Sequence, residues 1–65
     1  MRIELNGATV NTGAQTLAAL IAEQEIEADC VATALNGQFV PRGARENAAL
    51  CPGAKVEILS PMQGG

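Results

Sequence analysis

The sequence predicts an α+β fold in which one main helix packs on one face of a four- or five-stranded mixed sheet. Short stretches of alternating apolar and polar residues are typical of half-buried strands. Two Asn-Gly pairs, at residues 6–7 and 36–37, are strong signals for tight hairpin turns. A single stretch, residues 16–25, has the apolar spacing of an amphipathic helix. At 65 residues the chain has the size of one small domain.

The first half of the chain reads as a hairpin followed by the helix. Residues 1–5 alternate between apolar and polar side chains, which is the period of a strand. Asn6-Gly7 tolerates the positive φ angles of a type I′ turn, so residues 8–11 are expected to return as the second strand. Thr16 is suited to cap the helix, which we expect to end near Glu25. Its apolar stripe consists of Leu17, Leu20 and Ile21.

The second half reads as another strand pair, an irregular connection and a final strand. Residues 30–35 favour a strand, and the turn at 36–37 returns the chain through residues 38–40, where Pro41 ends the pairing. Residues 42–50 are the least regular, with one helical turn expected around residues 45–48. Residues 55–60 predict the last strand, with Val56 and Ile58 facing inward.

These elements combine most simply as a ubiquitin-like β-grasp arrangement. A right-handed crossover would place the last strand parallel to the first, in the middle of the sheet. We expect a domain over residues 1–60 and a flexible tail over residues 61–65. The predicted core consists of Ile3, Leu5, Val10, Leu17, Leu20, Ile21, Val31, Leu35, Leu50, Val56 and Ile58.

The composition argues against several classes of function. With 7 acidic and 4 basic residues and one aromatic side chain, the chain lacks the features of a nucleic-acid-binding surface. It has no histidine, the commonest general base and metal ligand, so we expect no catalytic residue and no metal site. The longest apolar run, residues 17–22, is too short to cross a bilayer, and no signal peptide is evident. We therefore expect a soluble cytoplasmic protein that is not an enzyme.

Two further features have open interpretations. Cys30 and Cys51 lack the spacing of a zinc site, and we expect reduced, partly buried thiols, although the sequence does not decide against a disulfide. The acidic run of Glu23, Glu25, Glu27 and Asp29 is either a solvated surface or a docking patch for a basic partner.

The tail Pro61-Met62-Gln63-Gly64-Gly65 follows the last strand directly. Pro61 has no N–H group to continue a sheet, and the two glycines make a slim thread that suits a narrow channel. If Gly65 is the terminus, its carboxylate is an anion at neutral pH and must be activated before it can act as an acyl donor.

Several segments together resemble the ThiS family of sulfur carriers over essentially the whole chain. They are the hairpin start with Asn6, residues 16–21, residues 31–37, Val40-Pro41-Arg42, residues 56–59 and Gln63-Gly64-Gly65. Two features depart from the family pattern. Residues 51–54 read Cys-Pro-Gly-Ala where relatives often have Asp-Gly-Asp, and the aromatic residue often found soon after Pro-Arg is missing.

The resemblance implies a carrier that other enzymes charge and discharge. An E1-like adenylyltransferase (ThiF-type) would use ATP and Mg²⁺ to adenylate Gly65. A sulfur donor enzyme would supply the sulfur of a thiocarboxylate on Gly65, and a thiazole synthase (ThiG-type) would accept that sulfur for thiamine. Gln63 and Gly64 would enter the partner active sites, and the carrier would bind no cofactor itself.

The candidate partner-binding residues are Phe39, Leu59, Met62 and Arg42. Two related interpretations keep the carboxylate chemistry: the sulfur carrier subunit of molybdopterin synthase, and a protein-conjugating ubiquitin-like modifier. A third interpretation is a small binding module in which the Gly-Gly pair is incidental.

Overall fold

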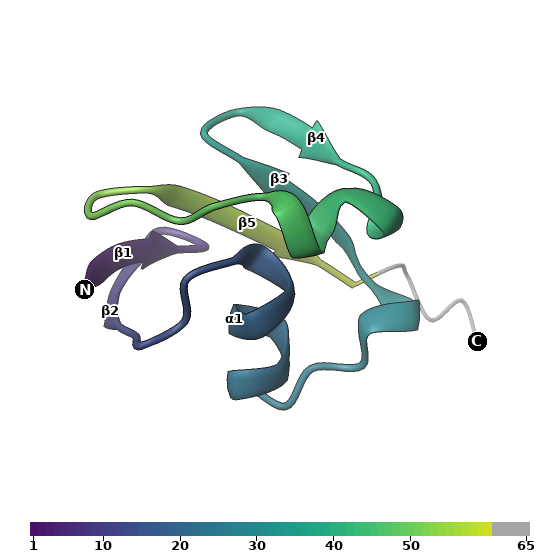
Figure 1. Cartoon of the computed structure of the whole chain (residues 1–65), viewed down its shortest axis with the longest axis horizontal. Helices are drawn as coiled ribbons and strands as arrows, with labels where there is room; N and C mark the ends of the chain where they lie inside the picture. Colours follow the sequence, from purple (N-terminus) through teal and green to yellow (C-terminus); the bar gives the residue numbers. More distant parts are fainter. Residues whose placement is uncertain (61–65) are drawn as a thin grey trace.

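The computed structural model describes residues 1–60, and its main helix and its strands follow one another in the order that the sequence predicts (Figure 1). A hairpin precedes the main helix, and a second hairpin and a short 3₁₀ helix precede the last strand. In chain order the elements are β1 (Arg2–Leu5), β2 (Ala8–Asn11), α1 (Leu17–Glu23), the 3₁₀ helix η1 (Ala28–Cys30), β3 (Ala32–Leu35), β4 (Gln38–Val40), the 3₁₀ helix η2 (Arg42–Asn47) and β5 (Lys55–Leu59).

The described residues form one mixed sheet of five strands in the order β2-β1-β5-β3-β4, with α1 on one face (Figure 1). β5 runs parallel to β1, with Leu5 opposite Val56, and antiparallel to β3, with Thr33 opposite Ile58. The last strand therefore lies in the middle of the sheet, which confirms the predicted topology. This arrangement is the β-grasp fold expected from the sequence.

Both Asn-Gly pairs form the expected turns. Asn6 and Asn36 have φ angles of 51° and 52°, and the glycines that follow have φ angles of 85° and 84°. Two successive residues with positive φ are the signature of a type I′ hairpin, which matches the twist of the flanking strands. Asparagine tolerates this backbone region better than most residues, and glycine adopts it freely.

The helix begins where the capping residue predicts. The Thr16 side chain accepts a hydrogen bond from the Ala19 N–H, and Leu17, Leu20 and Ile21 bury their side chains against the sheet. The helix ends at Glu23, two residues before the expected end. Glu25 follows with a φ angle of 58°, and such a left-handed residue stops helical hydrogen bonding.

Seven of the predicted core residues are buried among the described residues: Ile3, Leu17, Leu20, Ile21, Leu50, Val56 and Ile58. The other four, Leu5, Val10, Val31 and Leu35, are only partly buried and pack at the rim of this cluster. Leu5 and Leu35 are the last residues of β1 and β3, Val10 is in the edge strand β2, and Val31 directly precedes β3. The core also includes two small residues that the prediction omits, Ala14 and Ala54.

The connection before β5 contains a buried charge that the sequence did not predict. Its 3₁₀ helix spans Arg42–Asn47, slightly earlier than the turn expected at 45–48, and only 4% of Arg45 is exposed. The Arg45 guanidinium donates to Thr33 Oγ1 (3.0 Å), Ala28 O (2.9 Å) and Val31 O (2.7 Å). Arg45 thus joins η2 to η1 and to the start of β3.

Candidate functional site

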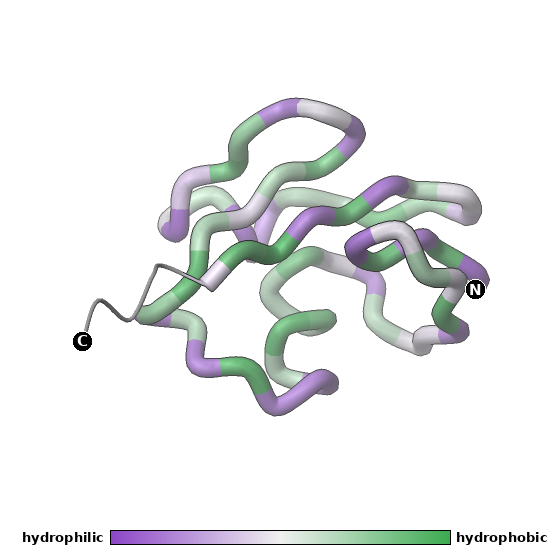
Figure 2. Tube along the Cα trace, turned by 180° about the vertical axis from the view of Figure 1, so that it is seen from behind, coloured by the Kyte–Doolittle hydropathy of each residue, from purple (hydrophilic) through white to green (hydrophobic). Residues whose placement is uncertain are grey.

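The strand β5 is the element that leads into the tail. Its side chains alternate between exposed and buried, so Val56 and Ile58 hold it in the core while Lys55, Glu57 and Leu59 face outward. Figure 2 shows hydrophilic and hydrophobic residues alternating along the first part of this strand. The tail residues Met62, Gln63, Gly64 and Gly65 lie outside the described residues, so their predicted roles remain predictions.

The sheet face opposite α1 carries an apolar patch, which we define as Ala32, Ala34, Phe39 and Leu59. The strand register places Phe39 beside Ala34 and Leu59 beside Ala32, and these four residues line one shallow hollow together with Thr33 and Glu57. Phe39 is 70% exposed and Leu59 is 64% exposed. Because the free energy falls when large apolar side chains are buried away from water, their joint exposure is typical of a binding surface.

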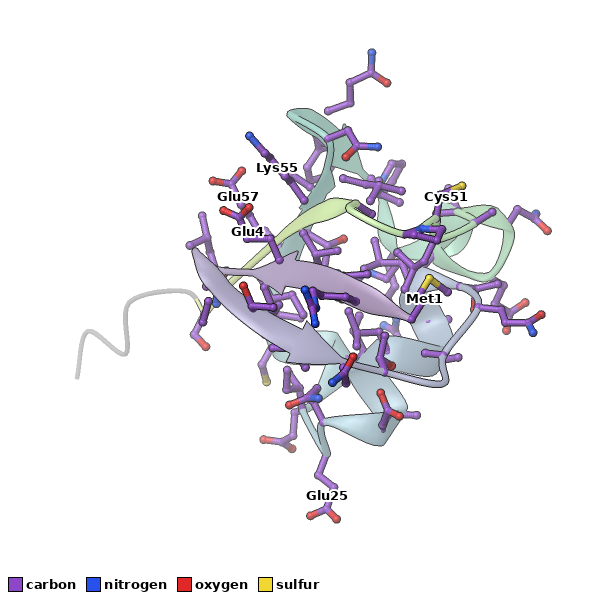
Figure 3. The ribbon with its side chains drawn as sticks, turned by 90° about the vertical axis from the view of Figure 1, so that its left-hand side faces the viewer. Met1, Glu4, Glu25, Cys51, Lys55 and Glu57 are labelled. Carbon is purple, nitrogen blue, oxygen red and sulfur yellow. The ribbon has the colours of Figure 1, made fainter. Side chains whose placement is uncertain are left out.

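The neighbouring part of this face is charged. Figure 3 shows the side chains of Glu4, Lys55 and Glu57 gathered on one side of the sheet, where β1 and β5 run together. One lysine between two carboxylates leaves little net charge. The outer face is therefore largely apolar over β3, β4 and the end of β5, and ionic over β1 and β5 from Lys55 to Glu57, which borders the patch.

A second hollow lies where β5 ends. It has a volume of about 320 Å³ and is lined by Asp29, Cys30, Val31, Ala32, Leu59 and Ser60. We call it the tail-root groove, because Ser60 is the last residue before the tail. Arg42 forms an exposed ion pair with Asp29, so it lies beside the groove and not in the apolar patch.

The acidic run does not form a free acidic surface. The Glu23 carboxylate accepts hydrogen bonds from the Thr12 hydroxyl and, at 3.4 Å, from the Gly13 N–H. Asp29 is paired with Arg42, while Glu25 and Glu27 are exposed. Two of the four acids thus have partners within the molecule, which favours the interpretation of this run as a solvated surface.

Both cysteines are free thiols, but they are exposed instead of partly buried as predicted. Cys30 lies in the short 3₁₀ helix η1, where few side chains cover it, and Cys51 lies in the loop before β5, as Figure 3 shows. Over residues 1–60 the acids and cysteines form no cluster of three that could hold a metal ion. Within the same residues, no helix has both the length and the apolar character needed to span a membrane.

Sequence reasoning expected Phe39 and Leu59 to be partly exposed, as they are, but missed the contacts that fix the end of β5. The Asn6 carboxamide donates to Ile58 O (3.1 Å) and accepts from the Ile58 N–H (2.8 Å). The Asn-Gly turn was predicted from its backbone preference, and a hydrogen bond to a residue 52 positions away leaves no local signal.

A family model for the ThiS family matches residues 2–65. The chain belongs to the ThiS family. A crystal structure of the thiamine biosynthesis protein ThiS from Geobacter metallireducens is 29% identical, with a TM-score of 0.84 and complete coverage of both chains. A solution NMR structure of a thiamine biosynthesis protein from the same organism has a TM-score of 0.80 at 29% identity. That comparison covers all of this chain and 88% of the other.

Comparison with curated protein sequences gave no match. The ThiS family assignment, together with the similarity to the two Geobacter structures, supports a sulfur carrier role in thiamine biosynthesis and interaction with the enzymes of that pathway.

Proposed function

We propose that this ThiS-family protein carries sulfur for thiazole formation in thiamine biosynthesis, as a thiocarboxylate on Gly65. The observation that supports this most strongly is the family match, which extends through the Gly-Gly pair to residue 65. A second support is the placement of β5, because the central strand of the sheet leads directly into these residues.

The proposed chemistry has two substitution steps, both in a partner enzyme. In the first, a carboxylate oxygen of Gly65 attacks the α-phosphorus of ATP, and pyrophosphate leaves. The product is an acyl adenylate, whose AMP is a good leaving group. In the second, hydrosulfide supplied by the sulfur donor attacks the Gly65 carbonyl carbon, and AMP leaves with the bonding electron pair. Loss of the proton on sulfur leaves the thiocarboxylate.

In this scheme the carrier is a substrate. The ThiF-type adenylyltransferase binds ATP and Mg²⁺ and holds the catalytic groups, while the carrier supplies a docking surface and the reactive carboxylate. The ThiG-type thiazole synthase then receives the sulfur. Gln63 and Gly64 enter both active sites, because glycine at position 64 adds no side chain to the width of the thread.

The apolar patch is the proposed docking surface for these partners. Phe39 and Leu59 are the large side chains of the patch, and Leu59 lies next to the tail-root groove. Five extended residues from 61 to 65 span at most about 17 Å. Gly65 can therefore reach an active site that lies within this distance of the end of β5 when the enzyme is bound to the patch. Met62 is proposed as a further partner contact, and Arg42 offers a charged contact beside the tail-root groove.

The test is an intact-mass measurement on the purified protein after incubation with the cognate adenylyltransferase, ATP and a sulfur donor. The expected mass increase is the difference between one sulfur and one oxygen atom, located on Gly65 by fragmentation. A chain without Gly65 is the matched control and should gain no mass. An unchanged mass for the intact chain in the presence of active cognate enzymes would refute the proposal.

A capture experiment then tests the pathway. Immobilised thiocarboxylate protein should retain thiazole synthase from a lysate of the source cells. Retention of the large molybdopterin synthase subunit instead would move the carrier to that pathway. Attachment of Gly65 to protein amines would indicate a conjugating modifier.

A further inference from the structure

Backbone hydrogen bonds pair β1 with only part of β5, so this parallel pairing alone would end before the tail. The Glu4 N–H donates to Ala54 O (2.8 Å), and the Asn6 N–H donates to Val56 O (2.9 Å). The next rung of a parallel ladder would need the Asn6 carbonyl and the N–H of residue 8. The chain reverses at Asn6 and Gly7, so these two groups belong to the hairpin turn.

The Asn6 side chain supplies both missing groups. Its Oδ1 accepts from the Ile58 N–H at 2.8 Å, and its Nδ2 donates to Ile58 O at 3.1 Å. A carboxamide has the same donor and acceptor pair as a peptide group, so it replaces one peptide unit of the ladder. Both bonds are partly buried, which reduces competition from water.

The Asn6 side chain thus keeps β5 paired with β1 at Ile58, two residues before Ser60. On the other side, β3 pairs with β5 as far as Leu59, through Thr33 opposite Ile58 and Ala32 opposite Leu59. Ile58 is therefore held on both edges. Without the Asn6 side chain, β5 would lose its β1 partner after Val56, and its last three residues could swing away from β1.

We infer that Asn6 is a positioning residue for the chemistry at Gly65, an inference that rests on the proposed function. The Asn6 carboxamide sets the point and direction in which the chain leaves the sheet. Once an activating enzyme has bound the outer face, this direction determines how often the carboxylate reaches the reactive geometry. Misplacement of a reacting group by about 1 Å can slow a reaction as much as 100-fold.

The second Asn-Gly turn provides a matched control at the other end of β5. Asn36 has nearly the same φ angle as Asn6, and its Oδ1 accepts from the Lys55 N–H at 3.0 Å. Asn6→Gly and Asn36→Gly each keep a residue that adopts positive φ and remove only the side chain. Asn6→Asp also tolerates this backbone, keeps the acceptor for the Ile58 N–H, and puts an oxygen in place of the donor.

The experiment measures adenylation of the full chain by its activating enzyme, with kcat and KM determined for the carrier. For Asn6→Gly we expect kcat to fall about tenfold while KM changes by less than about twofold, because docking is intact and tail placement is not. Asn36→Gly should leave both constants within about twofold of wild type. Asn6→Asp should lie between wild type and Asn6→Gly in kcat.

Amide hydrogen exchange measured by NMR supplies an independent readout. The Ile58 amide should exchange at least about tenfold faster in Asn6→Gly than in wild type, and the Lys55 amide should show this change in Asn36→Gly. Equal kcat values for the two glycine variants, or unchanged Ile58 exchange in Asn6→Gly, would overturn the inference. If Asn6→Gly does not fold, Asn6→Asp decides, and a kcat equal to wild type then rejects the role. Wild-type protein that is never adenylated refutes the proposed function instead, while Ile58 exchange still tests the contact.

Discussion

Replacement of Arg45 by methionine should destabilise the domain far more than the same change at Arg42. The two arginines lie three residues apart in η2, but their surroundings differ. Arg45 is 4% exposed and donates three hydrogen bonds to Thr33, Ala28 and Val31. Arg42 forms one exposed ion pair with Asp29. Methionine has a long apolar stem of similar reach, so the comparison isolates the guanidinium group.

The expected loss for Arg45→Met is about 2–4 kcal/mol. A hydrogen bond to a charged group contributes about 1.5–3 kcal/mol net, and three bonds from one group are not additive. The variant leaves two carbonyl oxygens without their donors, but it also removes the cost of burying a charge. The exposed pair of Arg42 contributes less than about 1 kcal/mol. A chain of 65 residues has a total stability of about 3–10 kcal/mol, so loss of Arg45 removes a large part of it.

The assay is urea denaturation followed by far-ultraviolet circular dichroism, because the chain has no tryptophan or tyrosine for fluorescence. Arg45→Met should lower the transition midpoint strongly, or be unfolded without urea, while Arg42→Met stays close to wild type. If the two variants unfold at the same urea concentration, the three Arg45 hydrogen bonds contribute nothing net, and our account of η2 is wrong.

Two further predictions concern the surface. Phe39→Ser and Leu59→Ser should change the free energy of unfolding by less than about 1 kcal/mol, because both side chains are mostly exposed, yet each should raise KM for the adenylyltransferase about tenfold or more. Thr9→Ala, an exposed change on edge strand β2, is the control. An unchanged KM in both serine variants would exclude the apolar patch as the docking surface. Cys30 and Cys51 are both exposed and free, so a thiol reagent should label two sites per folded chain without denaturant. Labelling of fewer than two sites would contradict their exposure.

The sequence was sufficient for the fold because its local signals agree with one another. Alternation over residues 1–5 and 55–59, the two Asn-Gly turns and the Thr16 cap each depend on neighbouring residues, and the crossover rule then orders the strands. Phe39 and Leu59 were left out of the predicted core, although alternation did not decide which way Leu59 faces, and both are exposed in the structure. The roles of Met62, Gln63, Gly64 and Gly65 stay predictions, since these residues lie outside the described part of the chain.

Contacts that depend on tertiary structure could not be predicted in this way. An arginine is usually exposed, and the burial of Arg45 depends on carbonyl groups of η1 and the start of β3 that only the fold brings together. Ala14 and Ala54 likewise lie outside the helices and strands, and their burial in the core depends on the fold. Cys30 was expected to be partly buried from the average behaviour of cysteine, but a short 3₁₀ helix offers little cover.

The central position of β5 has a consequence for how the protein matures in the cell. In the sheet of residues 1–60, with the strand order β2-β1-β5-β3-β4, β5 lies between the two hairpins and pairs with both. During synthesis both hairpins emerge from the ribosome before β5 does, so the sheet is completed only when the segment next to the tail has appeared. The apolar patch takes its residues from β3, β4 and β5, so an unfinished or misfolded chain in which β5 has not paired lacks the assembled patch.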